Sequence, residues 1–441
     1  MNGQSPFRDT IFALSSGGLP SGVAVIRLSG PRAGNAVARL AGALPPPRRA
    51  VLRELRDVDG VVLDRALVLF FPSPASVTGE DCAEFHVHGG RAVVAAVLRA
   101  LGALPGLRQA EAGEFTRRAF VNGRMDLTGA EALADLIGAE TEAQRRLALD
   151  NVEGGQQALY SGWRSRLLHA RAMIEAELDF ADEADVPGAV SDRIWTDMRE
   201  LCEEIDGHVE GFRAAEVVRD GFCVVLVGAP NAGKSSLLNA LARREVAIVT
   251  DVAGTTRDLV EVTLDLDGMK VLVVDTAGLR ETQDKVERIG VEKAIAAASR
   301  ADLVLELVDP RAPEQDQVDR AWQAPVLRVA TKSDLWGTTN DGFDHVISVV
   351  TADGLGRLIA EIARRAETAG TRQGAAVPTR LRHVELLRAT KAHVLEALVP
   401  KDLELRAEQL RLASASLGRI TGTVDVEELL DVIFSQFCIG K

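Results

Sequence analysis

The first part of the chain alternates short apolar runs with turn residues. Three of these runs have the length and the residue types of β-strands: Gly22–Leu28, Val61–Phe71 and Asp81–Val87. One helix-like stretch, Ala92–Leu101, interrupts them. We therefore predict a compact α+β domain over residues 1–122.

The apolar period then changes to steps of three and four, which is typical of helices, over residues 123–216 and again over 380–441. Asp425 and Glu428 fit a capping box at the start of a last helix. We interpret the apolar stripes as helix-packing faces. They consist of Trp163, Leu167, Ala170, Ile174 and Leu178, then Met198, Leu201, Ile205, Val209 and Phe212, and finally Val426, Leu429, Leu430, Ile433, Phe434 and Phe437.

Residues 217–379 lie between the two helical regions and follow the order strand, Gly-rich loop, helix and strand. The polar segment Glu367–Thr379 at its end predicts a flexible linker. An α/β unit flanked by helices on both sides indicates insertion into a discontinuous helical domain. The predicted fold class is therefore multidomain, α/β plus α, with an α+β N-terminal domain.

Charge and cysteine content narrow the function. The 441 residues carry a net charge of −13. Thirteen acidic residues and only two arginines fall between Glu175 and Glu210, so we do not expect that stretch to bind nucleic acid. A local basic patch elsewhere on the protein is still compatible with this charge. No apolar leader and no membrane-length apolar run is found, so we expect a cytoplasmic protein without a membrane partner. The four cysteines form no CxxC pair, which argues against structural zinc and a disulfide framework; Cys202 and Cys223 are expected to be buried small hydrophobes.

The strongest chemical signal is Gly228–Ser235, GAPNAGKS, which follows the apolar run Cys223–Val227. It satisfies the P-loop pattern GxxxxGK[ST] in the required order of strand, loop and helix. In such a loop backbone N–H groups surround phosphate oxygens, Lys234 reaches the β- and γ-phosphates, and Ser235 binds Mg²⁺. The sequence therefore predicts a nucleoside triphosphate site.

Two further motifs identify the nucleotide. Asp275 ends an apolar strand and starts the sequence DTAG, where it would hold Mg²⁺ through water, while the Gly278 amide would sense the γ-phosphate. Asp334 follows another strand and accepts two hydrogen bonds that guanine offers and adenine does not. We therefore predict GTP as the substrate. Thr331 stands where translation-factor-type GTPases usually have Asn, which we expect to weaken guanine affinity.

The loop between the first two motifs contains Thr256, the expected second protein ligand of Mg²⁺. Leu279 occupies the position where Ras-like proteins have the water-orienting Gln, and the Asn231 side chain is placed to help bind a monovalent cation. The residues expected to bind GTP are Asn231, Ala232, Gly233, Lys234, Ser235, Ser236, Thr250, Asp251, Val252, Ala253, Gly254, Thr255, Thr256, Asp275, Thr276, Ala277, Gly278, Lys332 and Asp334.

These segments, together with the C-terminal FCIGK, resemble the tRNA-modification GTPase MnmE (TrmE) family. VAVIRLSG, SVTGED, HVHGG, GEFTRRAFVNGRMDL and AEALADLI resemble its N-terminal and early helical regions, so the likeness covers essentially the whole chain. The resemblance implies a tetrahydrofolate-binding N-terminal domain that forms a homodimer, a helical domain in two chain segments, and an inserted G domain that pairs with its counterpart in a K⁺-dependent way.

The resemblance also implies roles for individual residues. The K⁺ ligands would be Asn231, Thr250, Val252 and Thr255, and Glu287 would position the hydrolytic water. A tetrahydrofolate derivative, 5,10-methylene-tetrahydrofolate or its 5-formyl analogue, would contact Arg27, Glu84, Arg124 and Lys441. Cys438 would be either a catalytic nucleophile or a packing residue.

The family implies a GTPase that acts with an FAD- and NADH-dependent partner similar to MnmG (GidA). Together they would add an aminomethyl or carboxymethylaminomethyl group at C5 of the wobble uridine, position 34, of certain tRNAs. Two alternatives stay open: a ribosome-assembly GTPase, and a folate-dependent aminomethyltransferase with a regulatory GTPase.

Overall fold

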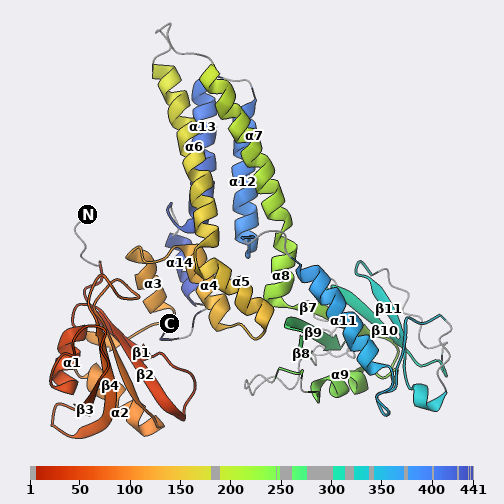
Figure 1. Cartoon of the computed structure of the whole chain (residues 1–441), viewed down its shortest axis with the longest axis horizontal. Coiled ribbons are helices and arrows are strands. Elements are labelled where there is room, and N and C mark those ends of the chain that lie inside the picture. The colour runs from red at the N-terminus through yellow and green to blue at the C-terminus, as the bar shows by residue number, and fades with distance from the viewer. Residues whose placement is uncertain are drawn as a thin grey trace, which may run out of the picture. The chain divides into compact units, whose positions relative to one another are not determined.

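The computed structural model describes residues 6–179, 189–244, 246–248, 261–275, 301–312, 322–336, 342–371, 376–399, 402–424, 427–435, 437 and 439–440. The chain divides into two compact units, one made of Met1–Ala134 and Leu417–Lys441 and the other of Asp135–Ser416. Figure 1 shows their elements. Among the helices in these ranges, none combines the length and the apolar character that crossing a membrane requires.

The first unit is built on a six-stranded sheet with the order β3-β4-β5-β2-β1-β6. Its pairs are antiparallel except for β1 and β6, which run parallel. The strands are β1 (Thr10–Leu14), β2 (Ser21–Ser29), β3 (Val51–Arg56), β4 (Val62–Phe71), β5 (Cys82–Gly89) and β6 (Leu107–Gln109). The three predicted strands are confirmed as β2, β4 and β5, whereas the shorter β1, β3 and β6 were not predicted.

Alternation along the strands separates the two faces of this sheet. Ile26 in β2 and Phe85 in β5 are fully buried in a cluster shared with α1 (Ala33–Ala41) and α2 (Arg91–Gly102). Because side chains alternate, their neighbours Arg27 and Glu84 lie on the opposite face, directly across from each other in the register of β2 and β5. The sheet therefore places two of the predicted folate residues side by side.

The end of the chain belongs to this first unit. Helix α14 (Glu427–Ser435) packs with α3 (Glu114–Val121) and α4 (Leu127–Ile137). Four residues of its predicted apolar face, Leu430, Ile433, Phe434 and Phe437, are buried, as expected; Asp425 and Val426 lie outside the described residues. The Ser15 hydroxyl donates to the Gly440 carbonyl, 2.8 Å away, so the C-terminal segment is attached to the end of β1.

A buried arginine joins α3 to the two segments that precede β1 and β5. The guanidinium of Arg118, fully buried, contacts carboxylates of Asp9 at 2.8 Å, Glu114 at 2.9 Å and Glu80 at 3.2 Å. Burial raises the pKa of Glu114, but hydrogen bonds from Arg108 and Arg118 outweigh this effect and lower the pKa below its usual range. Glu80 also accepts a bond from Ser29, 2.6 Å away, so the loop before β5 is firmly held.

The second unit contains a helical part and a second sheet. Its helices are α5 (Glu142–Val152), α6 (Gly155–Asp179), α7 (Ala189–Glu210), α8 (Phe212–Asp220), α12 (Leu381–Leu398) and α13 (Leu403–Thr421), the last ending in the first unit. Helix α7 packs against both α6 and α12. Helices that precede and follow the second sheet in the sequence therefore lie together, as the periodicity predicted. Trp163, Leu167, Ala170, Ile174, Met198, Leu201 and Ile205 of the predicted stripes are buried.

The second sheet has the order β12-β11-β10-β7-β9-β8. All its pairs are parallel except β8 with β9. Its elements are β7 (Phe222–Val227), β8 (Glu261–Leu266), β9 (Met269–Asp275), β10 (Leu303–Val308), β11 (Val326–Ala330) and β12 (His345–Val346), with α9 (Lys234–Ala242) and α11 (Leu355–Gly370). Cys202 is buried as predicted, Cys223 is only half-buried, and burial raises the pKa of both thiols to about 11, which keeps them protonated.

The predicted flexible linker is wrong at both described ends. Glu367–Gly370 forms the last turn of α11, because Ala366 completes the apolar stripe of that helix and is fully buried. Gly370 approaches Met269 so closely that an added Cβ would lie 2.5 Å from its Cε. After the segment 372–375, which is outside the described residues, Val377 and Thr379 are buried again. Polar composition alone therefore did not identify the described ends of Glu367–Thr379 as packed parts of the structure.

Candidate functional site

The phosphate loop connects β7 to α9. Gly228 has a φ of 144°, and a Cβ there would lie 2.3 Å from the Leu307 carbonyl oxygen on β10, so only glycine fits. Asn231 also has a positive φ, 67°, although it carries a side chain. Helix α9 starts at Lys234, directly after Gly233, so its N-terminus faces the loop as a phosphate site requires.

Lys234 and Ser235 lie where the motif predicts. The Lys234 ammonium donates to the carbonyl oxygens of Gly228 and Ala229 at 2.7 and 2.9 Å. The Ser235 hydroxyl donates to a carboxylate oxygen of Asp275, 2.8 Å away, at the end of β9. The first two motifs are therefore in direct contact, and together they present the oxygen donors that Mg²⁺ prefers.

The third motif is joined to the phosphate loop by two side chains. The buried Thr331 hydroxyl donates to the Ala232 carbonyl at 2.7 Å and lies 3.2 Å from that of Val308. The Lys332 ammonium donates to the Asn231 carbonyl at 2.6 Å. Two consecutive carbonyls of the loop are thus bound by two consecutive residues of the guanine-recognition segment.

Sequence reasoning missed the groups that support this segment. Asp309, just after β10, accepts a bond from Lys332 at 2.9 Å, and hydrogen bonds from Arg311 and Lys332 hold the pKa of its carboxyl well below its usual range. The Ser348 hydroxyl donates to one oxygen of Asp334, at 2.6 Å. The position of Asp309 could have indicated its role, because it directly follows a buried strand, β10, that neighbours β7 in the sheet.

The structure therefore brings together Asn231, Ala232, Gly233, Lys234, Ser235, Asp275, Lys332 and Asp334, with Ser236 exposed on α9. Several other predicted residues lie outside the described part of the chain. These are Thr250, Asp251, Val252, Ala253, Gly254, Thr255, Thr256, Thr276, Ala277, Gly278, Glu287, Cys438 and Lys441.

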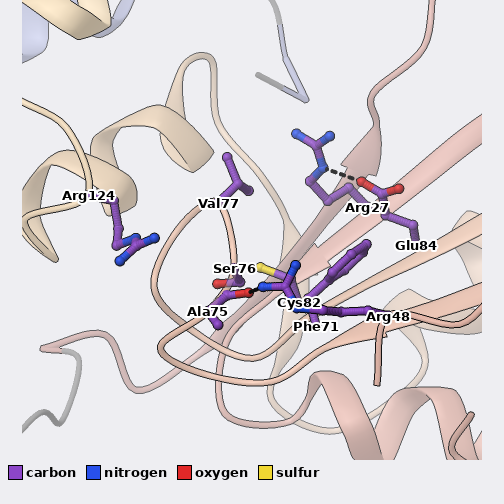
Figure 2. A pocket seen from close by; sticks show the side chains of 9 residues that line it. All are labelled: Arg27, Arg48, Phe71, Ala75, Ser76, Val77, Cys82, Glu84 and Arg124. Carbon is purple, nitrogen blue, oxygen red and sulfur yellow. Dashed lines mark hydrogen bonds and ion pairs between the residues drawn. The ribbon is translucent and has the colours of Figure 1, made fainter. Parts of the chain in front are cut away.

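A second candidate site is a pocket of about 240 Å³ in the first unit. Figure 2 shows its lining, which includes the three described folate residues Arg27, Glu84 and Arg124. Arg27 and Glu84 form an ion pair at 3.0 Å, and His86 contacts the other Glu84 oxygen at 3.1 Å. The remaining lining residues, which the sequence did not single out, are Arg48, Phe71, Ala75, Ser76, Val77 and Cys82.

Comparison with known proteins covers the chain in two parts. Residues 10–124 match the family model described as GTP-binding protein TrmE N-terminus, and residues 127–438 match the MnmE helical domain. The chain is 60% identical to the tRNA modification GTPase MnmE of Mesorhizobium japonicum over 98% of this chain and 99% of that protein. It is 57% identical to the protein of the same description from Chelativorans sp., over the full length of both.

Among solved structures, the chain is similar to Aquifex aeolicus Era bound to GDP·AlF4⁻, with 22% identity, a TM-score of 0.27, and coverage of 41% of this chain and 68% of that one. The near-complete alignments with curated relatives and the two matched family models agree with each other. The chain belongs to the tRNA modification GTPase MnmE family.

Proposed function

We propose that this protein hydrolyses GTP and, with an FAD-dependent partner similar to MnmG (GidA), adds an aminomethyl or carboxymethylaminomethyl group at C5 of uridine 34 in certain tRNAs. The observation that carries the proposal is the contact of three nucleotide-binding motifs at one edge of the second sheet, in a chain 57–60% identical to MnmE proteins over nearly its full length. The protein acts in the cytoplasm as a homodimer.

Lys234, Ser235 and Asp275 bind the phosphates and Mg²⁺. The adjacent hydroxyl and carboxylate oxygens of Ser235 and Asp275, 2.8 Å apart, fit a hard divalent cation, which would neutralise charge on the β- and γ-phosphates. Thr256 completes the protein ligands of this ion, and Asp334 selects guanine.

K⁺ is the second ion of the proposed nucleotide site, bound by Asn231, Thr250, Val252 and Thr255. Asn231 lies exposed in the phosphate loop, and Lys332 holds its backbone carbonyl. K⁺ would supply the positive charge that an arginine finger gives in other GTPases. Glu287 positions the hydrolytic water, because Leu279 replaces the usual Gln.

The pocket of the first unit binds the one-carbon donor, 5,10-methylene-tetrahydrofolate or its 5-formyl analogue. Its residues fit that group: the Glu84 carboxylate suits the N–H donors of a pterin, and the guanidinium groups of Arg27 and Arg124 suit carbonyl and carboxylate oxygens. Lys441 completes this set, and Cys438 acts there either as a nucleophile or by position. FAD and NADH are bound by the partner.

Analysis of tRNA from a deletion strain tests this function. Wobble uridines without their C5 group, restored by the wild-type gene, are expected. Normally modified tRNA together with defective ribosomal subunits would contradict the proposal and favour a ribosome-assembly GTPase.

A further inference from the structure

Arg48 lies in the proposed folate pocket in an unusual backbone conformation. Its φ is 59°, in the left-handed region that side chains with a Cβ seldom adopt. A hydrogen bond from its N–H to the Phe70 carbonyl, 2.9 Å long, holds it there. Such conformations gather at ligand-binding positions, where the surrounding structure maintains them, so Arg48 is a candidate for a ligand contact.

The side chain of Arg48 is also fixed in place. Its guanidinium lies 5.9 Å from the centre of the Phe71 ring and donates to the Ala75 carbonyl. Within the described part of the chain, neither Arg48 nor Arg124 forms an ion pair, whereas Arg27 is neutralised by Glu84. The pocket therefore holds two guanidinium groups whose charge is not balanced by a described carboxylate.

The charges of the pocket are separated. In Figure 2 the Arg27–Glu84 pair lies on one side and Arg124 on the other, and Arg48 lines the same pocket with its guanidinium bonded to the Ala75 carbonyl. The stem of Arg124 passes close to Gly79, where an added Cβ would lie 3.2 Å from its Cγ. A ligand that complements this arrangement has a ring with N–H donors at one end and carboxylates at the other.

We propose that Arg48, together with Arg124, binds the carboxylates of the glutamyl tail of the folate, so that the protein prefers polyglutamylated donors. This inference rests on the proposed folate binding and extends it to the substrate form. A guanidinium held over an aromatic ring is already ordered, so its bond to a carboxylate costs less side-chain entropy.

A phosphate of bound tRNA offers the same anionic chemistry. The pocket favours the folate tail because Arg48 and Arg124 line it together with Glu84, the residue proposed to bind the pterin, so a single folate can reach all three. The tRNA source is tested below as the competing outcome.

The experiment is calorimetric titration of the full chain with 5-formyl-tetrahydrofolate carrying one or three glutamates, with 5-formyl-tetrahydropteroate, which has none, and separately with unmodified tRNA. Arg48→Asn removes the guanidinium, and Asn tolerates the left-handed conformation, so the fold is expected to persist. Arg49→Asn, at the neighbouring exposed arginine that does not line the pocket, is the matched control.

The wild-type chain should bind the triglutamate most tightly. Arg48→Asn should weaken triglutamate binding about tenfold, as expected for the loss of a charged hydrogen bond, and pteroate binding less than about twofold. If that variant fails to fold, Arg48→Lys, which keeps the charge and loses the planar fork, should show about a threefold loss.

Equal triglutamate affinity in wild type and Arg48→Asn overturns the inference and leaves the folate site intact. Lower affinity for tRNA with unchanged folate binding also overturns it, in favour of a phosphate contact. A wild-type chain that binds none of the three compounds instead refutes the folate part of the proposed function.

Discussion

Thr331 offers the sharpest test of how the nucleotide site is organised. Its hydroxyl is buried and donates to the Ala232 carbonyl of the phosphate loop at 2.7 Å. Thr331→Val keeps the shape of the side chain and removes the donor. Because Ala232 is only 2% exposed, its carbonyl then loses a partner where little water replaces it. Leaving a buried acceptor unsatisfied costs about 1–3 kcal/mol.

This cost should appear in nucleotide affinity. Without the bond, the loop samples conformations that do not fit phosphate, and the apparent affinity falls with the population of the competent one. A cost of about 1–3 kcal/mol corresponds to a loss of nucleotide affinity of about fivefold to about 150-fold. We expect a loss of about tenfold, because the bond from Lys332 to Asn231 still holds the neighbouring carbonyl.

The assay is equilibrium titration with fluorescent GDP and GTP analogues in buffer containing Mg²⁺ and K⁺. Thr331→Ser, which keeps the hydroxyl, is the control and should bind almost as well as wild type. GTP affinity within about twofold of wild type in Thr331→Val would refute the idea that this bond organises the loop, whatever the melting temperature shows.

Four further predictions concern guanine recognition, the monovalent cation, and the buried Arg118 with its carboxylates. Asp334→Asn should lose the preference for GTP over ATP in competition binding, and unchanged selectivity would contradict the guanine assignment. Replacing K⁺ by Na⁺ should sharply lower GTP turnover, whereas equal rates would exclude the cation role. Arg118→Met should lower the free energy of unfolding of the first unit by about 3–5 kcal/mol in urea denaturation at pH 7, because the buried Glu80 loses the Arg118 cation and Glu114 keeps only Arg108; a loss below about 1 kcal/mol would contradict this. The lowered pKa of Glu114 stabilises the fold above its unfolded pKa of about 4.3, so wild-type stability should fall as the pH drops below about 4, and less steeply in Arg118→Met.

Much of the fold follows from local pattern in the sequence. Strands β2, β4 and β5 were predictable because apolar runs there are long and bounded by turn residues, and α6 and α7 because their buried positions repeat at helical spacing. Strands β1 and β3 were not predicted because five or six residues give too little periodicity and, unlike β7, they adjoin no recognisable motif. The end of α11 was mistaken for a linker because its polar composition was given more weight than the apolar stripe of the helix, which ends at the buried Ala366.

The two sites differ in how far the sequence predicts them. The phosphate loop is a continuous motif, so its residues are found from spacing alone. The pocket draws on Arg27, Arg48, Glu84 and Arg124, which are distant in sequence and meet only through strand register and loop packing. Resemblance supplied three of them, but Arg48 depends on a backbone conformation that residue types do not reveal.

In the proposed function, GTP hydrolysis is required for tRNA modification. The decisive experiment incubates unmodified tRNA with the purified chain, its FAD-dependent partner, the folate donor and GTP, and measures the wobble nucleoside by mass spectrometry. The C5 modification should form with wild type and GTP, and should be lost with a non-hydrolysable GTP analogue or with Glu287→Ala. Equal modification under all three conditions would show that GTP hydrolysis is not required and indicate a transferase in which the GTPase is only regulatory.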